Sequence, residues 1–314
     1  DGIRVLVRSR GLGDVYKRQA VLDVDSQSRA YATVDSVHVY GISGGHGINT
    51  ISNTGTITVA ATPYAYAETV ADGDGVDGDG TAYSNASTTA TTYGIAVGNG
   101  NNGILNDTGG VIDVSTTSNA RAYALSDSDV GGSANSDTVA TSRATAFGIR
   151  AGNGNNYIEN NGTISVNATA IASTYTRATN DNLTLCAPFG LGCTTINLGD
   201  SDADAVVTRA ASAYGIYTGS GDDVVFNRGT ITTSASGGTL IREAIHTGAG
   251  DDEVILGDGS VTTGDIDLGA DNDILTLIGT PIINGAIRGS EGTNTLALES
   301  EGTFSFDGYV TDFS

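Results

Sequence analysis

Pairs of aspartates follow glycines in three late segments of the chain, and carboxylates held in this way could bind a cation. The segments are Gly219-Ser-Gly-Asp-Asp-Val, Gly248-Ala-Gly-Asp-Asp-Glu-Val and Gly269-Ala-Asp-Asn-Asp-Ile. Their acids are Asp222, Asp223, Asp251, Asp252, Asp271 and Asp273. If the three turns stack, the carboxylates form a ladder of like charges that calcium could relieve, because calcium takes several oxygen ligands. The simpler interpretation, which the sequence favours, is that Gly, Asn and Asp occur because the turn needs positive φ.

The same segments resemble single copies of the GGxGxDxUx nonapeptide of calcium-binding β-rolls. True β-rolls repeat the nonapeptide in tandem, so that neighbouring turns share an ion. Here the copies stand well apart, beginning at Gly219, Gly248 and Gly269, and the earlier equivalents read Gly-Asn-Gly-Asn-Asn. The resemblance implies calcium as the only cofactor to consider, and a calcium-stabilised β-roll-like protein as a weaker alternative.

Groups that could catalyse a reaction are sparse. A β-helix that cleaves polysaccharides needs a basic proton acceptor beside acids, or paired carboxylates across a cleft. The histidines, His38, His46 and His246, have no recurring partners, and the only lysine is Lys17. We therefore predict no catalytic residues and no enzymatic activity. A carbohydrate-active β-helix of the lyase or hydrolase type is the alternative, and three or more acids converging on a concave groove near an arginine would favour it.

The chain has two cysteines, Cys186 and Cys193, which are close together in the sequence. Structural zinc needs four ligands with CxxC-like spacing, and that spacing is absent. We predict a disulfide between the two cysteines in an oxidising compartment rather than two free thiols.

A repeated aromatic-Gly-Ile signature marks the elements that must position these groups. Its copies begin at Tyr40, Tyr93, Phe147 and Tyr214, and each precedes a glycine-rich turn and a second strand start. The turn glycines that anchor successive repeats are Gly44, Gly98, Gly152, Gly219, Gly248, Gly269 and Gly289. The last two steps of this series are the shortest, and a coil of about 20 residues suits three short strands and their turns. We predict an all-β fold, a parallel β-helix (β-solenoid) of about seven coils.

The earlier repeats are longer than one coil, and their extra length falls after the second strand of the coil. The first two of these insertions are equal in length, the third is the longest and the fourth, before Gly248, is the shortest. Within them Ile164, Val166 and Ala168 alternate with polar residues, which is the strand pattern. Each insertion is therefore predicted to be a two-stranded arm with a small-residue inner face. Arg209 and the segment 20–39 fit this alternation poorly.

These patterns divide the chain into two parts. We predict a β-solenoid with long arms over 20–243 and a short-coil solenoid over 244–314.

The first nineteen residues stand apart from the repeats. Asp1 to Arg4 and Ser9 to Gln19 resemble a translated transposase-type sequencing adapter, with a short gap where a sample index would lie. We interpret residues 1–19 as a non-native segment and exclude them from fold reasoning. The alternative is a short basic strand that caps the solenoid.

The composition limits the partners. With 36 acidic and 14 basic residues, the formal net charge is −22. This charge opposes binding to nucleic acid, which requires a basic surface. Apolar runs long enough for a helical membrane span are absent from the sequence, so no direct membrane insertion is expected in this fragment.

The pattern Tyr-Gly-Ile-x-x-Gly-x-Gly-x-Asn-x-Ile-x-Asn-x-Gly-Thr-Ile resembles the passenger β-solenoids of bacterial autotransporters, which use type V secretion. The close from Gly269 to Phe313 resembles the passenger end that precedes a translocating barrel. The resemblance implies a right-handed parallel β-helix, secreted or displayed on a Gram-negative cell surface through an outer-membrane barrel, whose strand pattern does not appear before Ser314. It also implies a structural, adhesin-like role, with an unknown host protein or glycan as ligand.

Overall fold

The computed structural model describes residues 22–23, 26–74, 78–129, 132–180, 183–186, 193–196, 200–299 and 305–314. At 22–23, 26, 74, 183–186, 193–196 and 305 only the backbone is described. Residues 1–19, which we interpret as non-native, lie outside the described residues. All of the regular structure in the described residues is β-strand.

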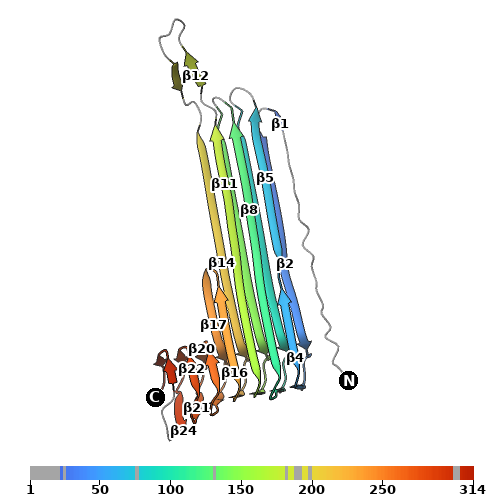
Figure 1. The fold of residues 1–314 in the computed structure, drawn as a ribbon, viewed down its shortest axis with the longest axis vertical. Helices are drawn as coiled ribbons and strands as arrows, with labels where there is room; N and C mark the ends of the chain where they lie inside the picture. Colours follow the sequence, from blue (N-terminus) through green and yellow to red (C-terminus); the bar gives the residue numbers. More distant parts are fainter. Residues whose placement is uncertain are drawn as a thin grey trace.

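Three parallel sheets stack coil upon coil along the molecule (Figure 1). The base sheet is formed, in order, by β3 (Thr50–Asn53), β7 (Gly103–Asn106), β10 (Tyr157–Asn160), β15 (Val224–Asn227), β18 (Glu253–Leu256), β21 (Ile274–Ile278) and β24 (Thr295–Glu299). Each of its strands pairs in parallel with the strand of the next coil. The predicted parallel β-helix of about seven coils is confirmed, with one base strand in each coil.

Each base strand turns into a strand of the outgoing sheet, and the chain comes back through the return sheet. The outgoing sheet contains β1 (Leu22–Asp23), β4 (Thr56–Ala61), β5 (Tyr64–Asp74), β8 (Val111–Ser128), β11 (Thr163–Asn180), β16 (Thr230–Ser236), β19 (Val261–Thr263), β22 (Ile282–Asn284) and β25 (Ser305–Asp307). The return sheet contains β2 (Ser26–Ser43), β6 (Gly80–Ala96), β9 (Ala134–Arg150), β14 (Ser201–Tyr217), β17 (Thr239–His246), β20 (Asp265–Asp267), β23 (Ile287–Arg288) and β26 (Val310–Thr311). The predicted insertions are therefore two-stranded arms, which extend far beyond the coil in Figure 1.

The arms shorten abruptly along the molecule. Strands β8 and β11 of the outgoing sheet have 18 residues each, whereas β16 has 7 residues. In the return sheet β9 and β14 have 17 residues each, whereas β17 has 8 residues. The next strands of the two sheets, β19 and β20, have 3 residues each. The change from long to short arms leaves a step on the flank of the molecule.

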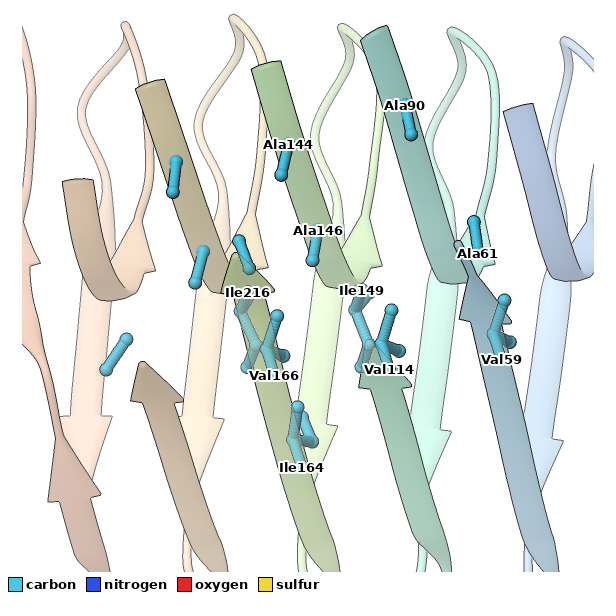
Figure 2. Packing of buried hydrophobic residues seen from close by; sticks show 14 of the residues in the cluster. Val59, Ala61, Ala90, Val114, Ala144, Ala146, Ile149, Ile164, Val166 and Ile216 are labelled. Atoms are coloured by element: carbon cyan, nitrogen blue, oxygen red, sulfur yellow. The ribbon is translucent and has the colours of Figure 1, made fainter. Parts of the chain in front are cut away.

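The interior changes from large to small side chains along each arm. Ile149, Ile164 and Ile216 are fully buried at the base, and Ala144 and Ala146 are buried further out (Figure 2). Small residues allow two sheets to lie closer than the usual spacing of about 10 Å. Several buried hydroxyls between the alanines bond within the arm, as Ser142 Oγ does to the Ser118 carbonyl at 2.8 Å, whereas those of Ser126, Ser128 and Ser136 have no partner among the described residues. The arm interior thus consists mainly of small side chains and contains hydrogen-bonded hydroxyls.

Two positions fit the alternation poorly for different structural reasons. Strand β2 alternates normally, with Ala30, Ala32 and Val34 buried, until a register shift between Val34 and Val37. Ser36 in this β-bulge has φ of 55°. Residues 201–209 of β14 are exposed on both faces, and the pairing of β14 with the next coil begins only at Ala210.

Candidate functional site

An aromatic surface lies on the outward face of the long arms. We define the tyrosine patch as Tyr64 and Tyr66 on β5, Arg121 and Tyr123 on β8, and Tyr175 on β11. The Tyr123 and Tyr175 rings stack with centroids 4.8 Å apart, and the Arg121 guanidinium lies 5.9 Å from the Tyr64 ring centroid. Tyr64 is 43% exposed and Tyr175 50%. Residues of this kind dominate the binding energy of many interfaces.

Strand register assembles this patch from three coils. Tyr66 pairs with Arg121, and Tyr123 pairs with Tyr175, in adjacent parallel strands. Alternate positions of the same strands carry the buried alanines Ala65 and Ala122, so the patch residues point outward.

A hollow of ≈ 210 Å³ adjoins the tyrosine patch further along the arm. Val70, Leu125 and Arg177 are neighbours in its floor, in register across β5, β8 and β11. Asp127 and Thr179 also line the hollow. The Thr179 hydroxyl donates a 2.7 Å hydrogen bond to Asp127 Oδ1. The arm face therefore combines stacked rings, cations and a shallow hollow, which suits contact with another molecule.

A second site lies at the step, where the arms shorten. Here a groove of ≈ 500 Å³ is lined by Glu243 on β17, Asp265 and Asp267 on β20, and the arginines Arg242 and Arg288. We call it the acidic groove. Three acids beside an arginine in a concave groove form the arrangement that favours the carbohydrate-active alternative over an even rod.

Two of the three acids already serve the solenoid. Asp265 accepts hydrogen bonds from the Ala286 N–H at 2.9 Å and from Arg288 Nη2 at 2.7 Å. Asp267 Oδ1 accepts from Ser290 Oγ at 2.7 Å and from the Gly269 N–H at 3.1 Å. The bonds from Ala286, Arg288 and Ser290 join consecutive coils, so the acids have a structural use without any substrate.

Glu243, His246 and Asp267 form a potential metal-ligand group that the sequence did not predict. One ligand atom from each lies within 4.8 Å of the others, and His246 Nδ1 lies 3.2 Å from Glu243 Oε2. Residues three apart in a regular strand point to opposite faces. The alternation is interrupted in β17, where Ala244 and Ile245 are both buried. Glu243 and His246 therefore lie on the same side, as Tyr214 and Tyr217 do in the preceding coil, and His246 pairs directly with Asp267.

The aspartates of the three glycine turns divide into an outer and an inner set. Asp222, Asp251 and Asp271 make up the outer set, which is more accessible to solvent. Asp223, Asp252 and Asp273 are buried, with exposed fractions of 1%, 2% and 1%. The sequence grouped all six as candidates, but only the inner three are buried in the solenoid.

The inner three form a continuous ladder along the molecule. The Asn156 N–H donates to Asp223 Oδ1 at 2.7 Å, the Asp223 N–H to Asp252 Oδ1 at 2.7 Å, and the Asp252 N–H to Asp273 Oδ1 at 2.9 Å. Burial raises the pKa of Asp252 to about 8, because these hydrogen bonds offset only part of the desolvation and the Asp223 and Asp273 charges add to it. Burial likewise raises the pKa of Asp273 to about 6 and the pKa of Asp223.

Cys186 and Cys193 lie opposite each other in an antiparallel hairpin of β12 (Leu183–Cys186) and β13 (Cys193–Ile196). Directly opposed residues in such a hairpin have Cα atoms about 4.5–5.5 Å apart, which is within the range of disulfides. The register therefore suits the disulfide, which stays a prediction because the two side chains lie outside the described residues.

No protein-family model, curated protein or solved structure matches this chain. Within the described residues, no helix is long and apolar enough to cross a membrane.

Proposed function

We propose that this chain is the non-catalytic, adhesin-like solenoid of a secreted or surface-displayed bacterial protein, as its resemblance to autotransporter passengers implies. The stacked coils supply a rod, and the arms present the tyrosine patch as the contact surface for a host protein or glycan. The patch supports this role because Tyr64 and Tyr175 stay about half exposed on rigid strands. Rigid exposed rings bind at a low cost in conformational entropy.

The test is a double variant, Tyr123→Thr with Tyr175→Thr, which keeps strand-forming residues at both positions. Binding of the labelled chain to epithelial cells and to a glycan array is expected to fall at least about tenfold, since truncating a hot-spot ring commonly costs about 2 kcal/mol. The matched control changes Tyr31 and Tyr83 to threonine. These rings also form a cross-strand pair, tilted and with centroids 5.6 Å apart, but they belong to the return sheet. Equal loss in both double variants, or loss in neither, contradicts the assignment to the tyrosine patch.

The acidic groove supports a second candidate, a glycoside hydrolase or polysaccharide lyase. Carboxylate oxygens of Glu243 and Asp267 lie within 4.8 Å, close to the separation of about 5–5.5 Å between the carboxyl groups of retaining glycosidases. We place this candidate below the adhesin-like rod, because Asp265 and Asp267 are already used in hydrogen bonds within the solenoid.

A direct assay separates the two functions. The purified chain is incubated with neutral and acidic polysaccharides, and new reducing ends and the ultraviolet absorbance of unsaturated products are measured. We expect no turnover above the rate without protein. Turnover that disappears in Glu243→Gln but survives in Glu253→Gln, a change outside the groove, would place the enzyme ahead of the rod.

A further inference from the structure

One position in each glycine turn carries an amide or a carboxyl group that joins neighbouring coils. It is asparagine at Asn49, Asn102, Asn156 and Asn294, and aspartate at Asp223, Asp252 and Asp273. Every Oδ1 of this series from Asn102 to Asn294 accepts the backbone N–H of the preceding coil. From Asn102 to Asn294, Oδ1 therefore accepts the same kind of hydrogen bond in every coil of the ladder, whether the residue is asparagine or aspartate.

The second side-chain atom of the asparagines faces oxygen atoms. Asn156 Nδ2 donates to the Gly152 and Gly154 carbonyls of its own turn at 3.0 and 2.6 Å and to Asp223 Oδ1 at 2.8 Å. Asn102 Nδ2 makes the equivalent three bonds, at 3.1, 2.7 and 2.7 Å. A group at this place therefore lies among three oxygen acceptors, and it must donate hydrogen bonds to them or carry positive charge.

In the aspartates this second atom is Oδ2, which brings no hydrogen when ionised. The Oδ2 atoms of Asp223, Asp252 and Asp273 are buried and have no hydrogen-bond partner in the described part of the chain. The Thr218 hydroxyl near Asp223 and the Thr247 hydroxyl near Asp252 donate instead to the Thr247 and Leu268 carbonyls, at 2.5 and 2.6 Å. Parallel pairing of Ser220 with Ala249, and of Ala249 with Ala270, keeps the three turns in register. Three unpartnered carboxylate oxygens therefore lie in successive coils, at the ladder position where Asn102 and Asn156 donate to oxygens.

The charge of the turns that hold these atoms is entirely negative. The turn segments 219–223, 248–252 and 269–273 contain six aspartates and no lysine, arginine or histidine. The outer carboxylates Asp222, Asp251 and Asp271 accept backbone N–H groups and one asparagine amide from neighbouring coils. Among the described residues, no ion pair between a basic group and the inner set is present.

We propose that Asp223, Asp252 and Asp273 bind calcium between the coils, with turn carbonyls as the other protein ligands. A hard cation replaces the missing hydrogens, because carboxylate and carbonyl oxygens are the ligands that Ca²⁺ takes in flexible geometry. Mg²⁺ fits less well, since it requires near-octahedral geometry and keeps several waters, for which a fully buried position has little room. Binding displaces any protons on the inner carboxyls, so it releases protons.

The test uses the metal-stripped chain at neutral pH, with calcium or magnesium chloride as the probe. Millimolar calcium is expected to raise the melting temperature by about 5 °C or more, because a ligand that binds only the folded state stabilises it. Calorimetry in two buffers of different ionisation enthalpy should show proton release on calcium binding, and magnesium should give a much smaller shift. No calcium bound in equilibrium dialysis, or an unchanged melting temperature, overturns the proposal. Stabilisation by acid alone, with no response to calcium, shows that protons rather than cations occupy the ladder and overturns it as well.

Two triple variants locate the site. The inner triple variant, Asp223→Asn with Asp252→Asn and Asp273→Asn, should fold, because asparagine stands at this position in other coils, and it should lose the response to calcium. The outer triple variant, Asp222→Asn with Asp251→Asn and Asp271→Asn, removes the same charge from more accessible positions and should keep the response. Loss of calcium binding in the outer variant alone assigns the ion to the surface and refutes the buried site.

Discussion

Replacing Asp252 with asparagine is expected to stabilise the protein at pH 8 to 9 in the presence of a chelator. Asparagine keeps the Oδ1 that accepts the Asp223 N–H. Its Nδ2 would add the donors that Asn156 uses toward its own turn. The change also removes a carboxyl group that is 2% exposed and lies between two other buried aspartates in the ladder.

The pH dependence follows from the raised pKa of Asp252, about 8 instead of 3.8. The folded protein holds this proton more tightly than the unfolded chain does. The associated stability is therefore fully present below about pH 4 and is lost as the pH rises toward 8. Because a tenfold change in proton affinity corresponds to about 1.4 kcal/mol, the loss amounts to several kcal/mol. Asp273, with a pKa of about 6, adds a smaller loss between about pH 4 and 6.

Thermal unfolding followed by circular dichroism between pH 4 and 9 measures the effect. The melting temperature of Asp252→Asn should exceed that of the unchanged chain by several degrees at pH 8 to 9 and by much less at pH 4. The control is Asp251→Asn, which removes the same charge from an exposed neighbour. A similar gain in both variants would attribute the effect to the net charge of −22, and a gain that does not change with pH would contradict a buried ionisable group.

The coil and the arms could be predicted because they depend on local spacing. Steps of about 20 residues between the last turn glycines indicate single coils. The alternation around Ile164 indicates a strand with one buried face. Ile164, Val166 and Ala168 are all buried in the structure. The same alternation predicts that Tyr123 points outward, since it follows the buried Ala122.

The candidate sites depend on relations between coils, which local spacing does not contain. Tyr123 and Tyr175 belong to different coils and stack because their strands pair in register. Glu243 and His246 lie on one side because the strand alternation is interrupted at Ala244 and Ile245, which are both buried. The two neighbouring aspartates of one turn are the same residue type, so the turn motif alone does not separate the buried Asp252 from the exposed Asp251.

The signature glycine illustrates the same dependence on the next coil. Glu243-Ala244-Ile245 occupies the place of a fifth aromatic-Gly-Ile signature, since Tyr214 pairs with Glu243 and Ile216 with Ile245. Ala244 is allowed there because β20 has no residue opposite it. Where the next coil is complete, its carbonyl oxygen occupies that space, and only glycine fits.

Replacing Gly148 with alanine is therefore expected to destabilise the protein strongly. The new Cβ would lie 2.6 Å from the Gly215 carbonyl oxygen and would also overlap the buried Ile164 side chain. Neither group can move away without breaking the packing of the adjacent coil. Overpacking of this kind costs about 1–3 kcal/mol or more, which corresponds to a fall in melting temperature of several degrees for a domain of this size.

Gly103→Ala is the matched control, because it makes the same chemical change in the neighbouring coil. A Cβ at position 103 meets no atom within 4 Å. The positions paired with Gly103 already carry side chains, those of Thr50 and Tyr157. Its melting temperature by circular dichroism should stay within about 1–2 °C of the unchanged chain, as for ordinary surface substitutions. Equal melting temperatures for Gly148→Ala and Gly103→Ala would show that the coils can separate to admit a methyl group, and the close approach of consecutive coils would then not be what requires glycine in the signature.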